Sequence, residues 1–199
     1  EKYNKEIVQS LMSKLNFKNI NAVPKIEKIV LNMGLGQEGL DKKKMEICIK
    51  DMSSITGQHP VKTKFKKSIS NFKSRKGSNA GLKVTLRNHR MYEFLDRLVN
   101  IALPRIKDFR GLKDSACDKF GNFTFGVKEH IIFPEINFDK VETIRGMDIT
   151  IVTSSNSKEN TISLLKEFNF PIVADNEKKK KKIKKIENIK NKEEKPEKG

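Results

Sequence analysis

Residues 52–92 contain no Asp or Glu, although acidic side chains are common in the rest of the chain. The same stretch carries ten bases: Lys62, Lys64, Lys66, Lys67, Lys73, Arg75, Lys76, Lys83, Arg87 and Arg90. Like charges that face each other on adjacent strands destabilise a sheet, and a negatively charged partner would remove that penalty. Nucleic acid is the strongest candidate, because each phosphate contact releases counterions.

Two segments of this block alternate between apolar and cationic side chains, as half-buried strands do. Val61, Thr63 and Phe65 alternate with Lys62, Lys64 and Lys66, and Leu82, Val84 and Leu86 alternate with Lys83, Thr85 and Arg87. We expect helices to cover the apolar side and the cations to form the opposite face. The alternative is a solvated face without a partner, but such faces normally mix positive and negative charges.

The remaining patterns predict helices over 3–15, 41–56 and 91–102, with a last helix that starts near Asn156 in a capping box with Glu159. Asp41 and Gly57 are the expected N-cap and C-terminal stop of the second helix. Strands are expected over 25–33, 122–127 and 148–153. Together these patterns predict an α+β two-layer sandwich: a mainly antiparallel sheet with helices packed on one face and a basic opposite face.

The net charge of +17 is shared by the whole chain: residues 1–174 carry +12 and residues 175–199 carry +5. We therefore expect a folded nucleic-acid-binding domain over 1–174 and a lysine-rich, disordered extension over 175–199. No run of 18 apolar residues is present, so no membrane span is predicted. Cys48 and Cys117 are far apart and predict reduced thiols in a cytoplasmic protein.

No catalytic or metal-ligating set emerges, and neither a cofactor nor a small-molecule substrate is predicted. The three histidines have no metal-ligand spacing. Gly34, Gly36 and Gly39 form a GxGxxG pattern after a predicted strand, which is typical of dinucleotide-binding enzymes. That enzyme hypothesis is disfavoured, because the acidic residue expected about 20 positions later falls inside the acid-free block. The alternative is a tight turn between a strand and a helix.

Several long segments resemble the bacterial large-subunit ribosomal protein number five family (the universal L5 family), which binds 5S rRNA. They include VPKIEKIVLNMGLG (23–36), TGQHPVKTKFKKSISNFKSRKG (56–77), GLKVTLRNHRMYEFLDRL (81–98), GNFTFGVKEHIIFPEI (121–136) and RGMDITIVTSS (145–155). The resemblance spans about residues 1–173 and excludes the tail. It implies a structural protein of the cytoplasmic ribosome, without catalytic activity, that attaches 5S rRNA in the central protuberance of the large subunit.

The resemblance also implies which residues contact 5S rRNA, namely Asn32, Met33, Gly34, Gln58, Thr63, Lys64, Lys67, Ser68 and Asn71. It implies a P-site tRNA contact by the loop Arg75, Lys76, Gly77, Ser78, Asn79 and Ala80, where the family usually has a Pro-Ile pair in place of Asn79-Ala80. The segment Asp108, Phe109, Arg110 and Gly111 and the region 127–145 are candidates for a bridge to small-subunit protein number thirteen. Contact with 23S rRNA is expected as well. A free RNA-binding protein that never enters a ribosome is the alternative from another class.

Overall fold

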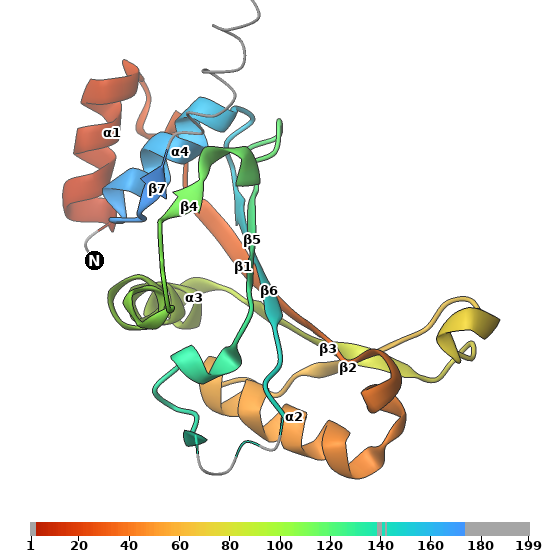
Figure 1. Cartoon of the computed structure of the whole chain (residues 1–199). Coiled ribbons are helices and arrows are strands. Elements are labelled where there is room, and N and C mark those ends of the chain that lie inside the picture. Colours follow the sequence, from red (N-terminus) through yellow and green to blue (C-terminus); the bar gives the residue numbers. More distant parts are fainter. Residues whose placement is uncertain (1–2, 139–140, 142, 174–199) are drawn as a thin grey trace, which may run out of the picture.

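A five-stranded antiparallel sheet crosses the centre of the molecule, and helices lie against one of its faces (Figure 1). The structure is a computed structural model that describes residues 3–138, 141 and 143–173. The strand order is β2-β3-β1-β6-β5. The strands are β1 (Ile26–Gly34), β2 (Val61–Lys64), β3 (Asn79–Leu86), β5 (Phe123–Val127) and β6 (Met147–Thr153). The predicted α+β fold with a mainly antiparallel sheet is therefore confirmed.

The four α-helices begin and end near the positions predicted from the sequence. They are α1 (Val8–Leu15), α2 (Lys42–Thr56), α3 (Asn88–Arg97) and α4 (Lys158–Glu167). The Asp41 side chain accepts a hydrogen bond of 3.0 Å from the Lys43 backbone N–H and so caps α2, which ends at Gly57 with φ of 65°. A π-helical turn, Leu98–Ala102, continues α3 until Pro104 interrupts it.

The capping box predicted for α4 is wrong. The N-cap is Ser157, one residue after Asn156, and its side chain makes no capping bond. The backbone N–H of Ser157 is instead satisfied from the preceding segment: it donates a hydrogen bond of 3.1 Å to the Ser155 hydroxyl. The chain thus makes a serine turn before the helix instead of a reciprocal cap.

The core lies between the helix-covered face of the sheet and the helices. Ile29, Leu31 and Met33 of β1 are at most 1% exposed, and every second residue of β3 from Leu82 to Leu86 is buried. Phe94 of α3 is fully buried and its ring centroid lies 5.8 Å from that of Phe133. Apolar side chains at helical spacing on α2, α3 and α4 complete this layer.

A second, parallel pairing at the end of the molecule near α1 and α4 was not predicted. It joins β4 (Leu112–Lys113) to β7 (Ile172–Val173). Strands of two residues carry no recognisable alternation, so the sequence gives no signal for them. Gly111, with φ of 89°, is required before β4, because a Cβ there would lie 2.4 Å from Cγ2 of Val173.

The GxGxxG pattern forms a turn and not a dinucleotide site. β1 is flanked on both sides by antiparallel strands, whereas a dinucleotide fold needs a parallel pair with a crossover helix. Gly36–Leu40 forms a 3₁₀ turn before α2. A Cβ at Gly39 would lie 2.9 Å from the Asn79 carbonyl oxygen, so this glycine lets the turn pack against β3.

None of the described helices is both long and apolar enough to cross a membrane. The predicted tail, 175–199, lies outside the described residues.

Candidate nucleic-acid interface

The chain between β2 and β3 leaves the sheet and projects away from the helices, as the yellow segment in Figure 1 shows. We call residues 64–78 the basic arm. At its base, the Phe65 N–H donates to the Ser78 carbonyl and the Gly77 N–H donates to the Phe65 carbonyl, each at 2.9 Å. Ile69 and Ser74 pair again further out. The arm is therefore a hairpin-like extension with its own backbone hydrogen bonds.

A 3₁₀ turn, Ser70–Phe72, forms the outer end of the basic arm. The Lys73 N–H donates to the Ser70 carbonyl at 2.9 Å, and Lys73 itself has φ of 50°. Behind the turn, the Ser68 hydroxyl accepts a hydrogen bond of 2.9 Å from the Lys76 N–H. These bonds hold the outer end in one conformation.

The sequence placed the loop of this hairpin at 74–81, which is only partly right. The chain leaves β2 already at Phe65, and Asn79 and Ala80 belong to β3. Of the predicted tRNA loop, only Arg75, Lys76, Gly77 and Ser78 lie in the arm. Gly77 has φ of 87°, and the Ser78 hydroxyl donates to the Arg75 carbonyl at 2.6 Å, so this turn is also ordered internally.

Every one of the ten bases in 52–92 is exposed. Within the part of the chain that the structure describes, none of the ten is paired with a carboxylate. Six of them lie in the basic arm, which has no acidic residue: Lys64, Lys66, Lys67, Lys73, Arg75 and Lys76. Exposed cations without counter-charges produce a strong positive potential that attracts a polyanion.

The side chains of β2 point to the opposite faces of the sheet from those predicted. Val61 lies opposite Lys83 and Thr63 lies opposite Gly81, and directly opposed residues share a face. Val61 is accordingly 69% exposed, on the same open face as Lys83. Lys62 lies opposite the buried Leu82 and so points to the helix side. The register shifts between Thr63 and Lys64, where the arm begins.

The open face of the sheet is consequently less basic than predicted. One row across it contains Lys83 of β3, Asn32 of β1 and Asp148 of β6. Another row includes Thr85, Val30 and Thr150. Lys28 of β1 also lies on this face, but most of the positive charge belongs to the β2–β3 side and the arm. The predicted cationic face is thus replaced by a cationic edge with a projecting arm.

The residues predicted to contact 5S rRNA fall into two groups. Lys64, Lys67, Ser68 and Asn71 are exposed residues of the basic arm. Asn32, Gly34 and Thr63 lie on or beside the open face close to the base of the arm. A Cβ at Gly34 would meet no atom within 4 Å, so its backbone borders open space.

Met33 and Gln58 contribute differently from the other predicted residues. Met33 as a whole residue is 1% exposed and belongs to the core, so the structure presents almost none of its surface to RNA. Gln58 lies in the turn between α2 and β2, where its carbonyl accepts a hydrogen bond of 2.9 Å from the Thr56 hydroxyl. Its side chain amide remains partly exposed at the start of the cationic edge.

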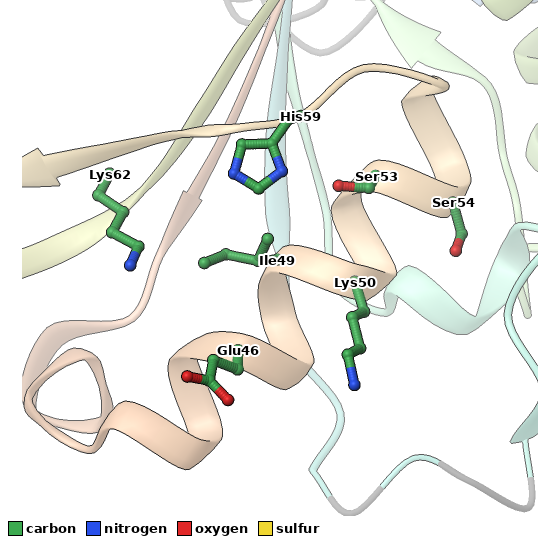
Figure 2. A pocket seen from close by; sticks show the side chains of 7 residues that line it. All are labelled: Glu46, Ile49, Lys50, Ser53, Ser54, His59 and Lys62. Carbon is green, nitrogen blue, oxygen red and sulfur yellow. The ribbon is translucent and has the colours of Figure 1, made fainter.

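A shallow groove lies between α2 and the start of β2 (Figure 2). Figure 2 shows His59 and Lys62 directed toward α2 from the strand side, above Ile49. The full lining is Glu46, Ile49, Lys50, Ser53, Ser54, His59 and Lys62. Lys62 thus lines the groove together with Ile49 and remains exposed to solvent.

A polar cluster around the buried His130, which the sequence did not reveal, holds His130 and Arg145 beside α2 and the turn that precedes it. His130 is fully buried, and its Nδ1 accepts a hydrogen bond of 3.1 Å from the Arg145 backbone N–H. Its Nε2 lies 3.8 Å from Oδ2 of Asp51, and Nε of Arg145 donates to Glu38 at 3.0 Å. Burial raises the pKa of the Asp51 carboxyl, although His130 and Arg145 oppose that shift.

The candidate bridge segment, 108–111, lies apart from the basic arm, next to β4. Asp108 and Arg110 are exposed, whereas Phe109 packs against the core. Residues 139, 140 and 142 of the second bridge region lie outside the described part.

No group of three or more metal-ligating side chains occurs among the described residues. Cys48 and Cys117 are buried free thiols, and burial raises the pKa of both.

Comparison with known proteins identifies the family of this chain. The family model described as ribosomal protein L5 matches residues 19–75, and the model for the C-terminus of the same ribosomal family matches residues 79–172. The "Large ribosomal subunit protein uL5" of Pelagibacter ubique is 60% identical over 173 residues, which are 87% of this chain and 94% of the relative. The proteins of the same name from Dichelobacter nodosus and Brevibacillus brevis are 54% and 52% identical, over 85% and 86% of this chain and 94% and 95% of theirs. This chain therefore belongs to the ribosomal protein L5 family.

Proposed function

We propose that this protein is a structural constituent of the large ribosomal subunit that binds 5S rRNA through the basic arm and the adjoining β2–β3 edge. As a member of the L5 family it is a structural protein and not an enzyme. The observation that carries the proposal is the set of ten exposed bases without a carboxylate partner among the described residues. Phosphates would supply the missing negative charge and release counterions.

The contact has an electrostatic part and a positioning part. Lys64 and Lys67 pair with phosphates, which provides affinity without base discrimination. Asn71, Asn32 and Gln58 present amides that can bond base edges or ribose hydroxyls and so fix the register. The open backbone at Gly34 lets the RNA approach the end of β1.

We further propose separate partners for the remaining surfaces. Arg75–Ser78, on the return of the arm, contacts P-site tRNA. Segment 108–111 and the region 127–145 face small-subunit protein number thirteen, and the His130–Asp51 cluster keeps the latter region in place. The extension 175–199 adds nonspecific affinity for neighbouring rRNA. These assignments place the protein in the cytoplasm, on the ribosome.

A binding titration of the full chain with 5S rRNA tests the main proposal. If about six to ten phosphates are neutralised, the association constant is expected to fall about 10³- to 10⁵-fold between 50 and 200 mM salt. An unrelated RNA of equal length should bind more weakly at every salt concentration. Affinity that is independent of salt, or equal for both RNAs, contradicts the proposal. Co-sedimentation with large subunits after a high-salt wash separates a ribosomal constituent from a free RNA-binding protein.

A further inference from the structure

Two large apolar side chains are exposed on the most cationic part of the molecule. Phe72 is 67% exposed and Ile69 is 48% exposed, both at the outer end of the basic arm. A single exposed apolar side chain is normal, but two of them close together in a segment whose charges are all positive indicate an interaction site. Neither side chain belongs to the core or packs against it within the described residues.

The turn holds Phe72 in a fixed position. Phe72 is the last residue of the 3₁₀ turn, followed by Lys73, whose N–H closes the turn. The paired Ile69 and Ser74 support the turn from below. Since the backbone is already ordered, a ligand that covers the ring pays little additional conformational entropy.

The charges around Phe72 identify the chemistry of that ligand. Lys67 and Lys73 are the first bases before and after Phe72 in the sequence, and Arg75 and Lys76 follow; all four are exposed, and the arm has no carboxylate. A protein partner for an apolar side chain would bring an apolar surface, whereas all the charged side chains of this segment are cations that phosphates would neutralise. A nucleotide satisfies both requirements, because every base has a face that stacks on an aromatic ring and carries its phosphate beside it.

We infer that Phe72 is a stacking site for an unpaired base of 5S rRNA, flanked by Lys67 and Lys73 as phosphate contacts. The inference rests on the proposed function and adds to it that the arm binds a loop, bulge or end, because bases inside a duplex are not available for stacking. Stacking tolerates different bases, so Phe72 adds affinity with little sequence preference.

Three variants of the full chain test the site by titration with 5S rRNA over a range of salt. Phe72→Ala is expected to weaken binding about tenfold or more while the salt dependence stays unchanged, because a stacked base is lost but no phosphate contact is. Phe72→Leu keeps an apolar side chain without a ring and should not restore binding. Phe72→Trp should restore it. Phe120→Ala, at a 74% exposed Phe outside the arm, is the matched control and should bind normally.

The Trp variant provides a direct signal, because the natural chain has no tryptophan. Its fluorescence should be quenched when 5S rRNA is added and should not respond to an equal length of double-stranded RNA.

The inference is overturned if Phe72→Ala binds like Phe120→Ala, or if Phe72→Leu binds like the natural chain. An effect of Phe72→Ala on incorporation into subunits, without an effect on RNA binding, indicates a protein partner and also overturns it. If the natural chain itself fails to bind 5S rRNA, the proposed function fails; if it binds and Phe72→Ala binds equally well, only this inference fails. Thermal unfolding should be the same for all variants, since Phe72 makes no core contact.

Discussion

Reversing two charges on the basic arm, Lys64→Glu together with Lys67→Glu, is expected to weaken 5S rRNA binding about 100-fold or more near 100 mM salt. Both side chains are exposed and have no carboxylate partner among the described residues, so no folded-state contact is lost with them. Each lost phosphate contact should also reduce the salt slope by about 1, hence by about 2 for the pair. A filter-binding or fluorescence titration at several salt concentrations measures both quantities.

A variant with the same change in total charge provides the control for this prediction. Lys113→Glu with Lys119→Glu alters two exposed lysines near β4 and β5, away from the arm. It should lose only the small long-range attraction that salt screens. Equal losses in the two double variants would show that net charge alone governs binding, and the arm would then have no special role.

Truncation of Phe94 to Ala is expected to lower the free energy of unfolding by about 3–5 kcal/mol. Phe94 is 0% exposed, and its ring stacks on Phe133 at 5.8 Å between centroids. Its removal leaves a cavity between α3 and the segment that begins the region 127–145. Chemical denaturation followed by circular dichroism measures the loss.

Phe120→Ala serves again as the comparison, because a 74% exposed ring should contribute less than about 0.5 kcal/mol. A small effect of Phe94→Ala would mean that α3 does not pack on the sheet as described. If the variant remains folded, RNA binding by the arm should be nearly unchanged, because the arm has its own hydrogen bonds.

Most of the framework could be predicted because its signals are local. In β3, every second residue from Leu82 onward is buried, and the residues between them are not. The helix α2 has both of its end signals in Asp41 and Gly57. The sheet was predicted to be mainly antiparallel, but the pairing of β1 with β3 and β6 was not predicted. The short strands β4 and β7 have no such pattern, and only their packing around Gly111 defines them.

The two faces of β2 could not be assigned from the sequence, because Val61 and Lys62 each suit either side. On this edge strand of four residues, Val61 is left exposed, while Lys62 lines the groove beside α2. The alternation continued in sequence to Lys66, but the hydrogen bonds of Phe65 already belong to the arm.

Composition indicated where the exposed bases lie, but not how that segment folds. The absence of acids from 52–92 predicted bases without carboxylate partners, and none of the described carboxylates pairs with them. The arm itself requires the pairing of Ile69 with Ser74, which no propensity indicates. The cluster of His130, Asp51, Arg145 and Glu38 was missed because its members come from distant parts of the sequence.

The most direct test of the account is ultraviolet crosslinking in cells, followed by identification of both the attached RNA and the crosslinked peptides. The predicted result is 5S rRNA attached to peptides from the basic arm, with Phe72 or its neighbours among the crosslinked positions. Crosslinks confined to other parts of the chain, or attachment of the arm to RNA outside the ribosome, would contradict it.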